Sequence, residues 1–147
     1  MLFKANELIN GKRFEVIKGF FVEKEVTCKV CMTPYRVAVE KRTDVNIAVQ
    51  MVGDCALDNV DTIVMVSADS DLLAPLHFIR KHYPHKKIKI YFPPENNSSA
   101  LADFARKHKI KLVRLENSKQ RFIRSILPDV VTKDDKTYTI PAKWKIT

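Results

Sequence analysis

The chain has 147 residues, 46% of them hydrophobic, which predicts a single domain with a core of its own. Lys and Arg outnumber Asp and Glu by 26 to 17, and the net charge of +9 favours a polyanionic partner, although a solvated basic surface has the same composition. No apolar stretch approaches the roughly 18 residues that span a bilayer. There is no signal-peptide layout, and three cysteines do not make a disulfide framework, so we expect a cytoplasmic protein.

The first part of the chain is predicted to alternate between helix and strand. In order, we expect a helix over 1–10, a strand over 14–21, two β-rich pieces over 25–31 and 34–40, and a helix over 44–57. The turn between the two β-rich pieces, Cys31–Pro34, predicts a hairpin. The last helix has Thr43 as its expected N-cap. Its apolar positions recur at helical spacing, at Val45, Ala48, Val49, Val52, Cys55 and Ala56.

The second part predicts a parallel sheet. We expect a strand over 62–66, a helix over 70–82, a strand over 87–92, a helix over 98–106, a strand over 111–115, and a helical basic segment over 118–126 before a polar tail. This order is typical of a doubly wound α/β sheet. The strand Thr62–Val66 is apolar throughout, which predicts burial on both faces, yet the downstream sequence supplies only one clear neighbour for it.

An acidic turn follows that apolar strand, with the sequence Ser67-Ala68-Asp69-Ser70-Asp71. Open α/β sheets bind their ligands at the carboxyl ends of their strands, so Asp69 and Asp71 are expected at such an edge. Two carboxylates one residue apart repel each other, and a cation between them relieves that repulsion. The turn therefore predicts a divalent metal site.

Several motifs in order resemble the NYN domain family, bacterial PIN-like domains of the metal-dependent ribonuclease type. Residues 40–48 (EKRTDVNIA) and 66–72 (VSADSDL) are similar to the family strings "EKGxDVNxA" and "SGDSDL". Residues 92–94, 124–129 and 141–144 look like its "FPP", "RxSQLPD" and "RPxxW" segments. The resemblance implies an α/β fold: a three-layer, PIN-like and Rossmann-like parallel sheet with a β-hairpin insertion, over residues 1–127, and a C-terminal tail over 128–147.

The same resemblance implies an activity, the hydrolysis of RNA phosphodiester bonds by an endoribonuclease that uses Mg²⁺ or Mn²⁺. Carried over position by position, Asp44, Asp69 and Asp71 are the catalytic and metal-binding acids. The side chains implied to support these acids are Asn46, Ser67 and Ser70. The basic side chains implied to bind the RNA partner are Lys41, Arg42 and Arg124.

The residues themselves also allow structural explanations for these acids. A carboxylate in the first turn of a helix, as at Asp44, gains from the helix dipole. Asp69 or Ser70 is a typical N-cap for the next helix. Glu40 is either a fourth acid of the site or an ion-pair partner of the basic residues that follow it.

Two departures from the family pattern affect what we expect. Ala68 stands where the family commonly has Gly, and the family's opening strand with an "IDGxN"-like motif is absent. That strand carries a metal-site acid and would lie beside 62–66, so we expect a domain truncated at its N-terminus, from a shortened gene or as a fragment. The alternative to a catalytic domain is then a non-catalytic remnant of the family that binds RNA or a protein. The exposed edge also predicts a homo-oligomer.

Cys28 and Cys31 have the C-x-x-C spacing of half a zinc site. A tetrahedral site needs two more ligands, which come either from elsewhere in the chain or from a second chain. The alternative is a pair of reduced thiols at a hairpin turn.

Overall fold

The computed structural model describes residues 2–145, and its contacts divide the chain into two compact units. The sheet unit is Lys18–Ser118, and the terminal unit combines Met1–Ile17 with Lys119–Thr147. The predicted domain bounds, 1–127 and 128–147, stay a prediction. No helix among the described residues is long and apolar enough to cross a membrane.

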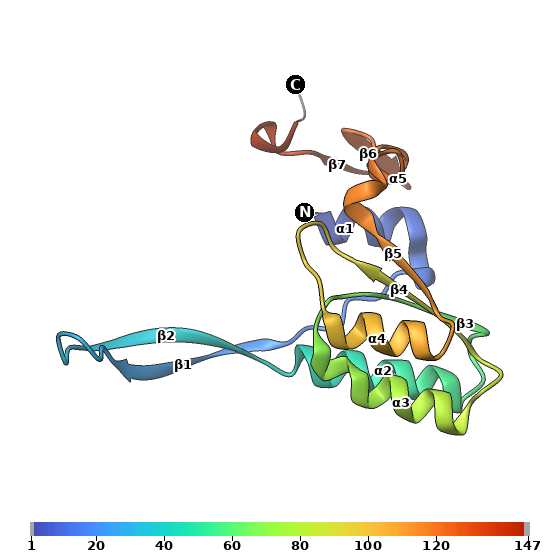
Figure 1. Ribbon diagram of the computed structural model, residues 1–147. Helices are drawn as coiled ribbons and strands as arrows, with labels where there is room; N and C mark the ends of the chain where they lie inside the picture. Colours follow the sequence, from blue (N-terminus) through green and yellow to red (C-terminus); the bar gives the residue numbers. More distant parts are fainter. Residues whose placement is uncertain (1, 146–147) are drawn as a thin grey trace. The chain divides into compact units, whose positions relative to one another are not determined.

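The sheet unit holds a three-stranded parallel sheet, with strand order β3-β4-β5 (Figure 1). Thr62 of β3 lies opposite Lys87 of β4, and Lys89 of β4 lies opposite Lys111 of β5. The predicted α/β fold with a parallel sheet is therefore confirmed. The elements of this unit, in chain order, are β1 (Phe20–Thr27), β2 (Pro34–Lys41), α2 (Thr43–Ala56), β3 (Thr62–Val66), α3 (Leu73–His82), β4 (Lys87–Phe92), α4 (Ser99–Lys107) and β5 (Lys111–Arg114).

The core of the sheet unit lies between one face of the sheet and helices α2, α3 and α4 (Figure 1). Alternate strand residues point into it, namely Ile63, Met65, Ile88, Ile90 and Phe92. The helices contribute Met51, Cys55, Leu76, Ile79, Leu101, Phe104 and Ala105. Right-handed crossovers that advance in one direction across a sheet leave their helices on one face, which explains why α3 and α4 lie on the same side.

Strand β3 is not buried on both faces, and that expectation was wrong. Val64 is 48% exposed and Val66 is 56% exposed, whereas Ile63 and Met65 between them are buried. The reason is that the three helices of the sheet unit pack on the opposite face. β3 is also an edge strand, because β4 is its only partner among the described strands. Self-association through this edge stays a prediction.

Helix α2 is rotated relative to the apolar stripe expected for it. Val45 and Val49 are 63% and 67% exposed, and the side chains that pack in or against the core are Ile47, Met51, Val52 and Cys55. The predicted stripe and the core-facing set share Val52 and Cys55.

The predicted hairpin is present as β1 and β2, which pair antiparallel from Phe20 opposite Lys41 to Thr27 opposite Pro34. It extends away from helices α2–α4 (Figure 1), and none of its residues is buried. The strand expected over 14–21 begins only at Phe20. The cross-strand pairing starts there, because β2 ends at Lys41.

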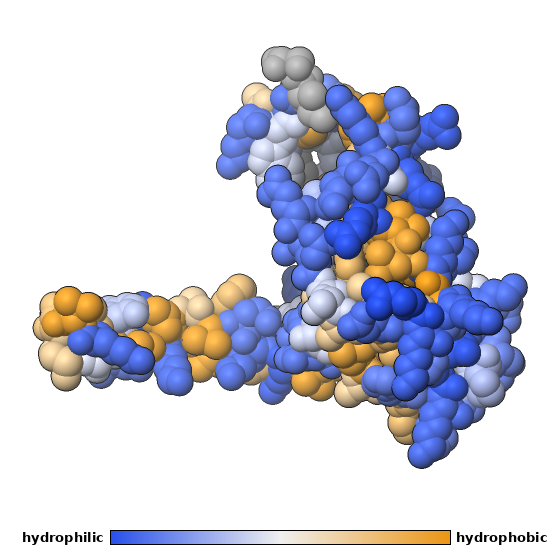
Figure 2. Space-filling view, viewed as in Figure 1, coloured by the Kyte–Doolittle hydropathy of each residue, from blue (hydrophilic) through white to orange (hydrophobic). Residues whose placement is uncertain are grey.

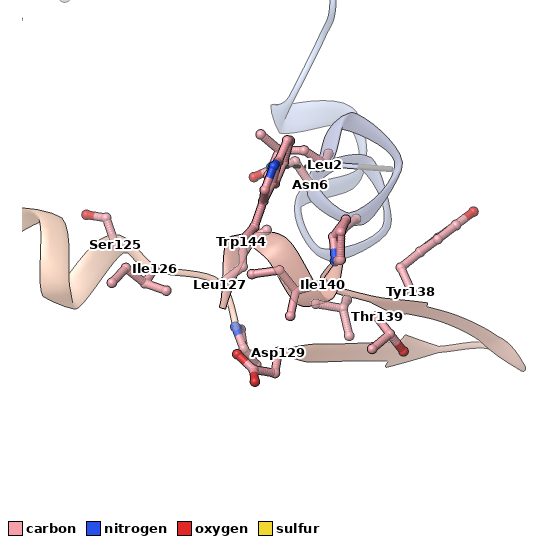
Figure 3. Close-up of a pocket in the computed structure, with 14 residues that line it drawn as sticks. Leu2, Asn6, Ser125, Ile126, Leu127, Asp129, Tyr138, Thr139, Ile140 and Trp144 are labelled. Carbon is pink, nitrogen blue, oxygen red and sulfur yellow. Dashed lines mark hydrogen bonds between the residues drawn. The ribbon is translucent and has the colours of Figure 1, made fainter. Parts of the chain in front are cut away.

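The terminal unit combines α1 (Leu2–Asn10), α5 (Lys119–Ser125), β6 (Val130–Lys133) and β7 (Lys136–Thr139), the last two forming an antiparallel hairpin. Inside it lies a mostly apolar cavity of about 310 Å³. Figure 3 shows Leu2, Leu127, Ile140 and Trp144 around this cavity. All the residues that line the cavity belong to the terminal unit. None of them is Asp44, Asp69 or Asp71, so the cavity is not the predicted metal site.

Candidate active site at the carboxyl edge of the sheet

The acidic turn after β3 is held by hydrogen bonds of its own residues. The Ser67 N–H donates to the Tyr91 carbonyl oxygen at 3.1 Å, which extends the β3–β4 pairing one residue beyond the strand. The Ser67 hydroxyl accepts from the Asp69 N–H at 3.1 Å. The Asp69 carboxylate in turn accepts from the Asp71 N–H at 2.9 Å. Asp69 is thereby fixed in orientation at the end of the strand.

The capping explanation for Asp69 is correct, since Asp69 is the N-cap of a 3-10 turn, Ser70–Leu72 (η2), that leads into α3. Capping uses one carboxylate oxygen, Oδ1. The residue is exposed, as are Ser70 and Asp71. A cap and a metal ligand are therefore compatible roles for this one side chain.

Asp69 lies in an open hollow of about 430 Å³ at the carboxyl edge of the sheet. The hollow is lined by the loops that follow β3 and β4, because the carboxyl ends of adjacent parallel strands meet at one edge. Its lining residues are Val66, Ser67, Ala68, Asp69, Pro93, Asn96 and Asn97.

The loop after β4 is tied to the end of β5 beside this hollow. The Asn97 side-chain oxygen accepts from the Arg114 guanidinium, which also lies 6.0 Å from the centroid of the Phe92 ring. The Glu116 carboxylate accepts from the Glu95 N–H at 3.2 Å and lies 3.9 Å from Arg114. These bonds hold an amide and a cation at the rim of the site.

Asn96, Asn97 and Arg114 are not among the site residues that the sequence predicts. A signal for them exists in the chain, because Pro93-Pro94 ends β4 at the ligand-binding edge and two amides follow within the same loop. Arg114 ends the neighbouring strand β5. Its pairing with Asn97 spans 17 residues of sequence, and only the folded chain brings the two together.

Asp44 lies in the first turn of α2 and is exposed. The start of this helix differs from the expected Thr43 N-cap. The helix begins at Thr43, and the Glu40 carboxylate caps it by accepting from the Thr43 N–H at 3.2 Å and from the Thr43 hydroxyl. Arg42 between them has φ of 77°, in the left-handed region. Glu40 thus fixes the backbone that carries Asp44.

The segment before β1 packs closely against this capped helix start. A Cβ atom on Gly19 would lie 2.7 Å from the Lys41 carbonyl oxygen, and closer still to the Glu40 carboxylate. The Asn46 side chain donates to the Lys18 carbonyl oxygen at 3.3 Å. Asn46 therefore joins the start of the hairpin to the helix that carries Asp44.

The three basic residues expected to bind RNA lie in different places. Lys41 ends β2 and is exposed. Arg42 places its guanidinium carbon 4.3 Å from the centroid of the Phe20 ring, a cation–π contact beside the start of α2. Arg124 belongs to α5 of the terminal unit.

The donor atoms of the acidic turn suit a hard cation. Mg²⁺ prefers carboxylate oxygens, keeps several waters, and is commonly bound through one or two carboxylates together with substrate phosphates. Among residues 2–145, no three His, Cys, Asp or Glu side chains gather closely enough to enclose a metal ion. Helix α2 nevertheless packs beside η2 and α3, so the helix that carries Asp44 neighbours the turn that carries Asp69 and Asp71. The residues fit an open site that substrate completes.

Comparison with known proteins finds a matching family model. The family model of the NYN domain matches residues 11–113 of the chain, a range that includes the hairpin, Asp44 and the acidic turn. The motif-like segments at 124–129 and 141–144 lie outside the match. No curated protein and no solved structure matches the chain.

Proposed function

The chain belongs to the NYN domain family, whose members are generally nuclease-like domains that cleave RNA, and from this premise we propose that it is a metal-dependent endoribonuclease. The observation that carries the proposal is the hollow at the carboxyl edge of the sheet, in which the oriented carboxylate of Asp69 lies with the amides of Asn96 and Asn97. Open α/β sheets bind their ligands at this edge.

In the proposed site, Asp69 and Asp71 hold Mg²⁺ or Mn²⁺, with Asp44 as a third acid. The metal, when bound, supplies charge neutralisation at the phosphodiester and a more acidic water. Ser67 orients Asp69 through the backbone bond described above. Asn46 fixes the start of α2 and so the position of Asp44. Ser70 opens the turn between the two acids.

The RNA partner is proposed to lie across the rim of the hollow. Arg114, held by Asn97, offers a cation to the phosphate backbone, and the amides of the same loop offer hydrogen bonds to sugar or base. Lys41 and Arg42 add positive charge near the start of α2. For Arg124, which belongs to the terminal unit, RNA binding stays a prediction. The excess of basic over acidic residues favours such a partner.

The proposal is tested by cleavage of a fluorescent single-stranded RNA with Mn²⁺, by the unaltered chain and by Asp69→Asn. We expect cleavage by the unaltered chain, its loss with a chelator, and a rate lower by roughly 10² to 10³ in the variant, as is typical when one electrostatic stabiliser is removed. RNA binding, measured by fluorescence anisotropy, is expected to persist in the variant.

A matched control is Asp103→Asn, because Asp103 is an exposed acid of α4 that pairs only with Arg106 at 2.8 Å among the ion pairs described. This control should cleave like the unaltered chain. If the unaltered chain binds RNA and does not cleave it, the catalytic proposal fails and the chain is a non-catalytic RNA-binding member of its family. Equal cleavage by Asp69→Asn would show that the site has been misassigned.

We also propose that the free edge of β3 pairs with a strand of a second copy. An edge strand presents unpaired backbone donors and acceptors that template another strand. Val64 and Val66 beside this edge are about half exposed. Pairing there would lengthen the sheet on the side where β3 has no described neighbour.

A further inference from the structure

The turn that closes the β1–β2 hairpin carries two of the chain's three cysteines, Cys28 and Cys31. The Cys28 N–H donates to the Thr33 carbonyl oxygen at 3.0 Å, and the Met32 N–H donates to the Cys28 carbonyl oxygen at 2.9 Å. Met32, directly after the second cysteine, has φ of 60°, in the left-handed region. These features close a tight turn that holds both thiols together.

The two thiols form a local hydrogen-bonded group. The Thr33 hydroxyl, the Thr33 backbone and the Cys28 side chain bond to Cys31 and lower the pKa of its thiol to about 7. The thiolate is the form of cysteine that binds metal ions. The turn thus presents two sulfur ligands, half-buried at Cys28 and exposed at Cys31.

The ligand set of one turn is incomplete. A C-x₂-C pair supplies two of the four sulfur ligands of a tetrahedral zinc site. Within residues 2–145, no third His, Cys, Asp or Glu joins the pair. The remaining cysteine, Cys55, is buried in the core between the sheet and its helices. Two further ligands must therefore come from another molecule.

The hairpin tip is accessible to a second copy of the chain. Figure 1 shows the hairpin extending away from the sheet and its helices, and Figure 2 shows apolar side chains at its free end. Val30 is 94% exposed and Met32 is 71% exposed. A two-stranded hairpin without a core is marginally stable in water, so a contact at the tip would also stabilise β1 and β2.

We propose that Cys28 and Cys31 of two chains bind one zinc ion between them, in a tetrahedral four-sulfur site that joins two hairpin tips. A twofold axis brings two identical pairs together and completes the shell. Each thiol loses its proton to solvent when zinc binds, and Lys29 in each turn lies beside the negative charge that results. The joined tips would cover Val30 and Met32 of both chains.

The test uses the full chain, freed of metal with a chelator and kept reduced with a phosphine. Zinc uptake is measured by competition with a chromophoric chelator, and mass by sedimentation. We expect one zinc ion for two chains and, in a chain whose β3 edge is blocked by Val64→Lys, conversion of monomer to dimer when zinc is added. Cobalt in place of zinc should give the visible spectrum of a tetrahedral four-thiolate site.

Two variants, Cys28→Ser and Cys31→Ser, should each lose both the bound zinc and the zinc-dependent dimer. Neither side chain contributes to the core, so the circular dichroism and thermal unfolding of the metal-free variants should match those of the metal-free unaltered chain. Val30→Ser, in the same turn but without a ligand atom, is the matched control and should keep the bound zinc. The proposal fails if zinc does not bind, if one zinc binds per monomer, or if Cys28→Ser still dimerises with zinc.

Discussion

The carboxylate of Asp69 accepts a hydrogen bond from the backbone N–H of Asp71 at 2.9 Å, so the first acid of the pair fixes the backbone that carries the second. One of its oxygens is used in the fold, while the residue remains exposed at the hollow. Stability and chemistry therefore depend on different properties of the same side chain, and they can be separated by substitution.

We predict that Asp69→Asn and Asp69→Ala differ in stability while sharing the loss of cleavage. Asn caps a helix start about as well as Asp, because its amide oxygen accepts the same bond, whereas Ala loses about 1 kcal/mol. Urea unfolding of the two variants measures this difference. Equal unfolding midpoints for Asn and Ala would show that the bond to Asp71 contributes nothing to stability.

A second prediction concerns the contact between Gly19 and the cap of α2. In Gly19→Ala, the added Cβ meets the Glu40 carboxylate and the Lys41 carbonyl oxygen, and the overpacking should cost about 1 to 3 kcal/mol of unfolding free energy. Since the cap positions Asp44, the rate of RNA cleavage should fall as well.

Gly53→Ala is the control for this variant. Gly53 lies in the interior of α2, and a Cβ there meets nothing within 4 Å. Ala is a better helix former than Gly, so this change should raise the unfolding free energy by about 1 kcal/mol. A loss of stability at Gly53 as large as that at Gly19 would contradict the steric explanation.

A third prediction tests the free edge of β3. Val64→Lys places a charge beside this edge, and charged edge residues oppose strand pairing between molecules. Sedimentation in the presence of a chelator, which excludes any zinc-linked dimer, should show less self-association than for the unaltered chain. Val49→Lys, at a valine of α2 that is more exposed (67%) than Val64 (48%), should leave the association state unchanged.

A fourth prediction concerns pH. The pKa of His108 is lowered by burial, with smaller effects of Arg80, Lys107 and His77 around it. A lowered pKa means that the unfolded chain binds the proton more readily than the folded one. The stability that neutral His108 contributes is therefore present above the ordinary histidine pKa of about 6.5 and is lost as the pH falls below it.

The variant His108→Phe keeps a ring beside Phe104, whose centroid lies 4.5 Å from that of His108. We expect a smaller loss of unfolding free energy between neutral and mildly acidic pH in this variant, measured by urea unfolding at a series of pH values. His85→Gln, at an exposed turn, is the control and should reproduce the pH dependence of the unaltered chain. An unchanged slope in His108→Phe would exclude His108 as its source.

The predicted hairpin and the strand–helix alternation were both readable from local patterns. Turn residues and β-rich runs predict a hairpin wherever they occur, and the buried Ile63 and Met65 follow from the apolar run that contains them. The acidic turn was likewise predicted from local sequence. It directly follows an apolar strand, and the carboxyl ends of parallel strands lie together at one edge of the sheet.

Local sequence patterns did not predict which side of α2 or which face of β3 is covered. The apolar stripe of α2 contains Val45 and Val49, yet both are exposed, since only packing against the sheet decides which side of a helix is covered. Val64 and Val66 are as apolar as their neighbours, and their exposure depends on which face the crossover helices take. The covered side of α2 and the exposed face of β3 therefore cannot be predicted from the local sequence.

By itself, the sequence determined the kinds of elements, their order, and the presence of two acids at the end of an apolar strand. Only the tertiary structure shows that one carboxylate oxygen of Asp69 accepts a hydrogen bond from the Asp71 N–H. It also shows that the Arg114 guanidinium donates to the Asn97 side chain beside the hollow that contains Asp69. The physical reason is the distance along the chain over which each kind of signal acts. Periodicity and turn chemistry act over a few residues, whereas a site is made where separate loops converge at the carboxyl edge of a parallel sheet.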